Sequence, residues 1–287
     1  MSVAKEIRSK IKSIEGTKKI TRAMEMVAAS KMKRAQQMML GARPYTNQIR
    51  SVIAHILATQ PHYQHAFFEE RPVRKVAYIV ISSKRGLCGG LNVNLFKKIL
   101  NQLKLNEEQA IENKACLVGL KAINFFNQVA IDPLATLELE GDLPSLEELI
   151  GLIGVGLRAF ENKDIDELYI CYNNFVNSMT ITPTIERLLP LKIDKAAVAL
   201  SDEYVYEGDP LEILNQFLSR YIEAIIYQAI LENFTSEQAS RMVAMKAASD
   251  NAVAIIDDLK LAYNKARQAA ITREISEIVG GAAALKV

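Results

Sequence analysis

Residues 211–279 read LEILNQFLSRYIEAIIYQAILENFTSEQASRMVAMKAASDNAVAIIDDLKLAYNKARQAAITREISEIV and contain neither glycine nor proline. Because these two residues most often interrupt a helix, the stretch predicts a single helix throughout. Gly208-Asp209-Pro210 directly precede it and are typical of a helix start. At 1.5 Å per residue such a helix would be about 100 Å long, several times the diameter of a small domain. It therefore needs a partner outside a compact core.

The composition of this segment changes along its length. Its first part carries bulky apolar residues, whereas thirteen alanines lie between Ala239 and Ala284. Alanine favours helix and lets two helices approach closely. The second part of the segment is therefore interpreted as a slim shaft.

The N-terminal segment predicts the partner. From Ala4 to Leu57, apolar or small residues recur at steps of three and four, which indicates a long amphipathic helix with a coiled-coil seam. Gly16, Gly41 and Pro44 are the points where it would bend. We expect segments 1–57 and 210–287 to pair as an antiparallel coiled coil, because they flank the rest of the chain.

The middle of the chain, residues 74–200, alternates predicted strands and helices. Val76 to Ser82 (VAYIVIS) is a continuous apolar strand of the kind buried on both faces. Further strands are predicted at 116–119, 134–139 and 167–175, with an edge strand at 179–189 that contains Pro183, and helices at 94–103, 121–129 and 146–160. The alternation predicts a Rossmann-like α/β domain with a mostly parallel, doubly wound sheet. The expected fold class is thus mixed, with a two-helix coiled coil and a central α/β domain.

A glycine-rich loop, RGLCGGLN at 85–92, follows the first strand. A P-loop needs Lys and then Ser or Thr after its last glycine, but Leu91 and Asn92 stand there. The dinucleotide fingerprint needs the spacing G-x-G-x-x-G, but the glycines here are spaced G-x-x-G-G. The loop therefore predicts no nucleotide site. We interpret its glycines as a tight turn with positive backbone angles.

The remaining reactive side chains predict no active site, metal site or cofactor. His55, His62 and His65 lie near the end of the first helix, where no Asp or Cys completes a ligand set. Cys88 is expected on an exposed loop beside two basic residues, but no histidine lies near it in sequence. The three cysteines are widely spaced, which is typical of a reducing compartment.

Charge is unevenly placed along the chain. The net charge is only +2, yet residues 1–50 hold twelve Lys or Arg against three Glu. Such a basic helix can face nucleic acid, anionic lipid or an acidic protein, or can be a solvated surface. We expect neither a secretory signal nor a membrane span, because the longest stretch without polar side chains, Leu149 to Leu157, is far too short.

Four motifs carry a family resemblance. They are KKITRAMEMVAASKMKRAQ at 18–36, RGLCGGLN at 85–92, EQASRMVAMKAASDNA at 237–252 and YNKARQAAITREISEIVGGA at 263–282. In this order they resemble the gamma subunits of bacterial F-type ATP synthases, and the resemblance covers essentially the whole chain.

The resemblance implies a central stalk. The coiled coil would lie inside a ring of three alpha and three beta subunits, and the α/β domain would bind the epsilon subunit and the c-ring. Proton flow would turn the c-ring and the shaft, which drives the catalytic beta subunits through their conformations. The chain itself would be non-catalytic and would bind neither nucleotide nor nucleic acid. It would be peripheral, at the cytoplasmic face of the cell membrane, and would reach the membrane only through the c-ring.

The resemblance also implies contact residues. Those facing the beta subunits are Lys18, Arg22, Met24, Arg85, Cys88, Arg241, Arg267, Gln268 and Thr272, and those on the side of the c-ring and epsilon are Tyr204 and Tyr206. Met24 fits coil packing equally well. Lys84 stands where many relatives carry an acid, and no close cysteine pair is present. The redox switch of chloroplast relatives is therefore not expected.

Two other classes of function remain open. A Rossmann-type nucleotide enzyme with helical arms would bind ATP by itself. A coiled-coil nucleic-acid binder that uses the basic first helix would show steeply salt-dependent binding to DNA.

Overall fold

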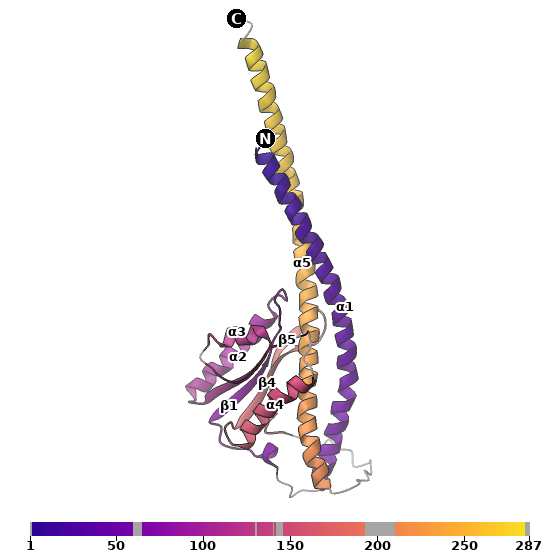
Figure 1. Ribbon diagram of the computed structural model, residues 1–287, viewed down its shortest axis with the longest axis vertical. Coiled ribbons are helices and arrows are strands. Elements are labelled where there is room, and N and C mark those ends of the chain that lie inside the picture. The colour runs from indigo at the N-terminus through magenta and orange to yellow at the C-terminus, as the bar shows by residue number, and fades with distance from the viewer. Residues whose placement is uncertain are drawn as a thin grey trace. The chain divides into compact units, whose positions relative to one another are not determined.

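The computed structural model describes residues 2–59, 65–129, 131–139, 141, 146–192 and 210–284. Its elements are α1 (Ser2–Thr59), η1 (Ala66–Phe68), β1 (Lys75–Ile81), α2 (Leu91–Glu108), β2 (Glu112–Val118), α3 (Leu120–Phe126), β3 (Asp132–Leu137), α4 (Leu146–Glu161), β4 (Glu167–Phe175), β5 (Ile181–Leu189) and α5 (Pro210–Ala284) (Figure 1). The chain forms two compact units. Met1–Ala28 with Arg241–Val287 is the coil unit, and Ala29–Ser240 is the α/β unit.

The α/β unit is built on a five-stranded sheet in the order β3-β2-β1-β4-β5. β1 pairs in parallel with β2 and β4, and β2 pairs in parallel with β3. β5 pairs antiparallel with β4 at one end of this order and carries Pro183. The predicted mostly parallel sheet is thus confirmed, and so is the edge strand that tolerates a proline.

Helices cover both faces of the sheet. On one face α2 and α3 pack with residues such as Leu95, Ile99 and Val80 in one buried cluster. On the other face α4 packs with the parts of α1 and α5 that belong to this unit, including Ile53 and Ile222 (Figure 1). This three-layer arrangement explains why the whole of β1 after its first residue is buried and apolar.

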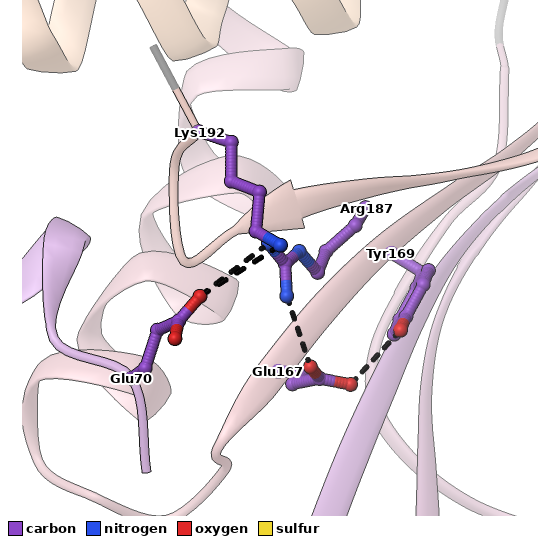
Figure 2. Close-up of polar contacts among 5 residues, drawn as sticks. All are labelled: Glu70, Glu167, Tyr169, Arg187 and Lys192. Carbon is purple, nitrogen blue, oxygen red and sulfur yellow. Dashed lines mark hydrogen bonds and ion pairs between the residues drawn. The ribbon is translucent and has the colours of Figure 1, made fainter. Parts of the chain in front are cut away.

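A charged network joins β4, β5 and the segment before β1, where β4 begins and β5 ends (Figure 2). Arg187 Nη1 lies 3.4 Å from Glu167 Oε1, and the Tyr169 hydroxyl donates to Glu167 Oε2 at 2.9 Å. Glu70 Oε1 lies 3.9 Å from Arg187 Nη2 and 3.8 Å from Lys192 Nζ. Burial, reinforced by Glu167, raises the pKa of Tyr169 to about 12. Partly exposed pairs of this kind stabilise little individually, but charges on an edge strand discourage pairing with other chains.

In the coil unit, buried positions follow steps of three and four. They are Met245, Ser249, Ala252 and Ile256 of α5 and Thr21 and Ala28 of α1. Within this unit the two helices run side by side (Figure 1). Small residues at most of these positions let the helices approach closely, as a coiled-coil seam requires. The predicted antiparallel coiled coil is confirmed.

Several elements differ in detail from their predictions. α5 ends at Ala284, within the predicted segment 210–287, and α1 stays helical through Pro44 and both of its glycines. Buried Met39 and Ile49 on either side of Pro44 help to hold α1 helical there. β3 begins at Asp132, two residues before its predicted start, because apolar spacing does not mark the exposed first residues of an edge strand. The functional division into segments 1–57, 74–200 and 210–287 stays a prediction.

Candidate functional site

The loop between β1 and α2 is held by the first turn of α2. The Ser83 N–H donates to Asn92 Oδ1 at 3.2 Å, and Asn92 Nδ2 donates back to Ser83 Oγ at 2.7 Å. The Ser83 hydroxyl then donates to the Arg85 carbonyl at 2.7 Å. Ser83 is fully buried, so these bonds fix the base of the loop.

Helix α5 hydrogen-bonds to the carboxyl end of β4 and to the loop that follows β1. Asn233 Oδ1 accepts from the backbone N–H of Asn173 at 3.1 Å and from Asn173 Nδ2 at 2.9 Å. The Ser236 hydroxyl donates to the Asn173 carbonyl at 2.9 Å, and the Ser240 hydroxyl donates to the Cys88 carbonyl at 2.7 Å. The three α5 residues share one helix face because they are three, four and seven residues apart. We call these five residues the polar clamp.

The polar clamp occupies the place where this sheet type binds ligands. In open α/β sheets, ligands bind outside the carboxyl ends of the strands where the strand order reverses. Here the order reverses between β1 and β4. Both Asn173 at the end of β4 and Cys88 in the loop after β1 bond to α5 at that point. A nucleotide would have to displace α5, which supports the interpretation of the glycine loop as a structural turn.

The backbone of this loop differs in part from the prediction. Gly89 has a φ of 59°, as expected for a tight turn, but Gly86 and Gly90 have no positive φ. The second left-handed residue is instead Leu87, with a φ of 63° and an exposed side chain. A left-handed non-glycine residue costs about 1–2 kcal/mol. The prediction of positive angles was therefore right at Gly89 and wrong at the other two glycines.

Cys88 corrects a second expectation. Its side chain is buried, with 2% of its surface exposed, and does not lie on the outside of the loop. Its Sγ accepts from Asn92 Nδ2 at 3.5 Å, while its carbonyl accepts from Ser240. The loop folds inward because α2 and α5 both bind it, and α5 is too distant in sequence to be foreseen. A reagent could reach this thiol only if the loop opened.

The native thiols are expected to be unreactive. Cys116 and Cys171 are also fully buried, and burial raises the pKa of Cys116 to about 12 and that of Cys171 further still. Since only the thiolate attacks, Ellman's reagent should label the folded chain at least about a hundredfold more slowly than the chain in denaturant. Rapid release of one thiol equivalent by the native protein would contradict this account of the loop.

The end of α5 carries an exposed apolar stripe. Ile271, Ile275, Ile278 and Val279 recur at steps of three and four, and between 43% and 70% of each is exposed. All described residues from 271 to 281 are exposed. An apolar helix face of this kind indicates a surface for a partner. The helical spacing of these residues is a signal, present in the sequence, by which an apolar helix face could have been predicted here, although not its exposure.

The sequence matches the family model described as ATP synthase over residues 3–285. It is 51% identical over 289 residues to the ATP synthase gamma chain of Acinetobacter baumannii, covering 99% of this chain and 100% of that relative. The chain belongs to the ATP synthase gamma-chain family. The gamma chain of Glaesserella parasuis serovar 5 is 50% identical over 288 residues, with the same coverage of both chains.

Two solved structures share the gamma-chain fold. A chain of the Tetrahymena thermophila mitochondrial ATP synthase, in a structure of the central stalk and c-ring, is similar with a TM-score of 0.61 and 24% identity, covering 80% of this chain and 99% of that one. A chain of the Euglena gracilis mitochondrial ATP synthase rotor is similar with a TM-score of 0.63 and 17% identity, covering 94% and 99%.

The gamma-chain contact residues predicted on α1 lie in the coil unit. Lys18 and Arg22 are exposed, and Met24 is half-buried. Arg22 Nη1 lies 2.9 Å from Glu25 Oε2, one helical turn along. The half-burial of Met24 is compatible both with packing in the coil and with contact to a partner.

The other predicted contact residues lie on α5 and in the glycine loop. Arg267, Gln268 and Thr272 are exposed beside the apolar stripe, whereas Arg241 is half-buried. Arg85 is exposed on the loop whose backbone the polar clamp holds. These roles stay predictions for every residue, and burial now argues against direct contact for Cys88 alone.

Some predictions fall outside the described residues or concern metals and membranes. Tyr204, Tyr206 and His62 lie outside the described residues. His65 Nδ1 accepts from the Phe67 N–H at 3.1 Å, and burial lowers the pKa of His65.

In the part of the chain that the structure describes, no group of three side chains that could bind a metal ion lies together. Among the same residues, no helix combines the length and apolarity that a membrane span needs.

Proposed function

We propose that this chain is the central rotor shaft of an F-type ATP synthase and carries no catalytic site of its own. Family membership supports the assignment to the central stalk. The observation that carries the mechanism is the exposed apolar stripe at the end of α5, on a helix whose earlier half packs against the α/β sheet. The stripe fits a partner that encloses the helix end, and a ring of three alpha and three beta subunits is such a partner.

The shaft acts by biasing conformations. Each orientation of the coil presents different side chains to the three beta subunits, so it favours a different conformation in each of them. A turning shaft therefore moves every catalytic site through the same sequence of states, because each state is stabilised only by its own contacts. ATP is made or hydrolysed in the beta subunits, while the chain transmits the coupling free energy.

Charge on the coil is proposed to guide this contact. Lys18 and Arg22 are exposed on a segment of positive net charge, which complements acidic levers of the beta subunits. Exposed charges that face opposite charges on a partner raise specificity and association rate more than affinity. The apolar stripe is accordingly proposed to supply most of the binding free energy at the tip.

The α/β unit is proposed to take up rotation from the membrane sector. It would bind the epsilon subunit and the c-ring, with the segment that contains Tyr204 and Tyr206 on that side. The chain would then be peripheral, at the cytoplasmic face of the membrane, and would reach the lipid only through the c-ring. Nucleotide binding is not expected, because α5 occupies the ligand-binding edge of the sheet.

Replacing Ile271, Ile275 and Ile278 by serine tests the stripe. The free energy of unfolding of the isolated chain should change by less than about 0.5 kcal/mol, because these side chains are exposed. Affinity for alpha and beta subunits should fall at least about a hundredfold, since each buried apolar side chain contributes roughly 1 kcal/mol or more. Size-exclusion chromatography of the chain with increasing concentrations of alpha and beta subunits measures this affinity.

A matched control changes the same number of exposed apolar residues elsewhere. Val93, Leu105 and Met179 are exposed in the α/β unit, and their serine variant should assemble with alpha and beta subunits as the unaltered chain does. Normal assembly by the stripe variant would contradict the proposed role of the α5 end.

A further inference from the structure

Two kinds of contact join α5 to the α/β unit. From Leu214 to Ile230 the buried side chains are mostly apolar and belong to the main core cluster. From Asn233 to Ser240 the contacts to β4 and the glycine loop include the hydrogen bonds of the polar clamp. Ser240 is the last residue of the α/β unit, and α5 continues with the coil unit at Arg241. The clamp therefore lies at the end of the anchored part of the helix.

The clamp holds one residue of β4 by three of its polar atoms. The last residue pair between β1 and β4 is Val80 with Cys171. Asn173 lies two residues further, and its N–H, its carbonyl and its side-chain Nδ2 bond to α5, whereas its Oδ1 is buried without a hydrogen-bond partner among the described residues. Asn173 and Asn233 are at most 2% exposed. In such a dry environment, the bonds are strong and their loss leaves polar groups unsatisfied.

These bonds resist a motion that apolar packing tolerates. Hydrophobic attraction is non-directional, so an apolar face opposes separation of two elements more than their sliding or twisting. A hydrogen bond weakens steeply once its distance or angle departs from the favoured range. A side-chain oxygen about 5 Å from the helix axis moves nearly 2 Å when the helix turns by about 20°. A twist of that size, or a slip of one residue, would break the whole clamp.

We propose that the polar clamp fixes the rotational register of α5 on the α/β unit, so that torque passes between the two without slip. This inference rests on the proposed function as a rotor shaft. Asn233, Ser236 and Ser240 are then positioning residues: they touch no substrate, but they fix the rotation of this part of α5 about its own axis against β4 and the glycine loop. The apolar contacts from Leu214 to Ile230 keep the helix attached, and the clamp fixes its rotation.

The test measures torsional stiffness in the complex with alpha and beta subunits. The subunit ring is fixed to a surface, and a bead is attached through Met179→Cys, since Met179 is exposed and the native cysteines are buried. While the complex pauses in its catalytic cycle, the thermal fluctuation of the bead angle reports the torsional stiffness of the chain between the ring and the bead. In the variant Ser236→Ala/Ser240→Ala, the variance of this angle should rise at least about twofold, because two directional bonds are lost.

Two controls separate register from stability. Ser240→Thr keeps the hydroxyl donor and should give the original variance. Ile226→Val removes one buried methylene from the apolar part of the α5 contact, and should lower the melting temperature without raising the variance. Serine-to-alanine changes add no volume, so the double variant should fold, which circular dichroism verifies.

The possible outcomes separate failure of the clamp proposal from failure of the rotor proposal. An unchanged variance in the serine double variant would overturn the clamp, and so would an equal rise in Ile226→Val, because general packing would then set the stiffness. If the unaltered chain formed no complex with alpha and beta subunits, the rotor proposal would fail, and the clamp's role in torque would fail with it. If the unaltered chain assembles and turns while the double variant keeps its stiffness, the clamp proposal fails alone.

Discussion

Replacing Gly119 by alanine is expected to lower the free energy of unfolding by about 4 kcal/mol. Gly119 has a φ of +92°, and a Cβ there would lie 2.5 Å from the Ser82 carbonyl oxygen and 2.8 Å from Ser82 Oγ. Ser82 cannot move aside freely. Its N–H and Oγ donate to the Val118 carbonyl at 2.9 and 3.0 Å, and its Oγ accepts from the Ala122 N–H at 2.8 Å.

Thermal unfolding followed by circular dichroism measures the effect. For a chain of this size, a loss of about 4 kcal/mol lowers the melting temperature by about 8–16 °C. Gly86→Ala is the matched control, because its added Cβ would meet only the end of the Lys121 side chain, at 3.9 Å and 4.0 Å. That variant should melt within about 2 °C of the unaltered chain. Equal melting temperatures for the two variants would show that the turn after β2 can relax.

Replacing Asn233 by leucine is expected to destabilise the fold by about 3 kcal/mol. The change keeps the approximate volume but removes the oxygen that accepts from the backbone N–H and the Nδ2 of Asn173. Both donors would then be buried without that acceptor, and each such group costs about 1–3 kcal/mol. Urea denaturation measures the loss, and hydrogen exchange at the Asn173 amide should become faster.

The control for this change lies on the same helix. Asn251 is exposed on α5, so Asn251→Leu should change the free energy of unfolding by less than about 0.5 kcal/mol. A similarly small effect at Asn233 would mean that water or a neighbouring group replaces the lost acceptor. The two bonds to Asn233 Oδ1 would then contribute little to the stability of the fold.

Local patterns in the sequence predicted the strands and helices because each pattern repeats within a few residues. β4 runs from Glu167 to Phe175 as predicted, since its apolar run is bounded by polar residues on both sides. The long helices followed from the spacing of apolar residues and from the absence of breakers between Leu211 and Val279. Predicted ends were less accurate, as at β3, which was predicted over 134–139 and runs from Asp132 to Leu137.

The polar clamp could not be predicted in this way. On a helix, Asn233, Ser236 and Ser240 have the composition of a solvated face, and their partners lie at least 60 residues away in sequence. Only the folded sheet shows that the strand-order reversal lies beneath that face. The inward position of Cys88 was missed for the same reason, because Ser240 holds its carbonyl from 152 residues away.

The apolar stripe on α5 could have been found. Ile271, Ile275 and Ile278 follow one helix face, a periodicity visible in the sequence. Periodicity alone does not tell a buried face from an exposed one. The exposure of these side chains in the coil unit supports the proposal that the stripe binds a partner.

The rotor proposal is tested by ATP hydrolysis by alpha and beta subunits of the same synthase, measured with and without this chain. The chain alone should neither hydrolyse ATP nor bind it tightly. Its addition should yield a stable complex of three alpha, three beta and one gamma-family chain, with activity raised at least about tenfold because the shaft biases the catalytic sites. Hydrolysis or tight binding of ATP by the chain alone would show that the chain is not a non-catalytic shaft, and so would alpha and beta subunits left unchanged by its addition.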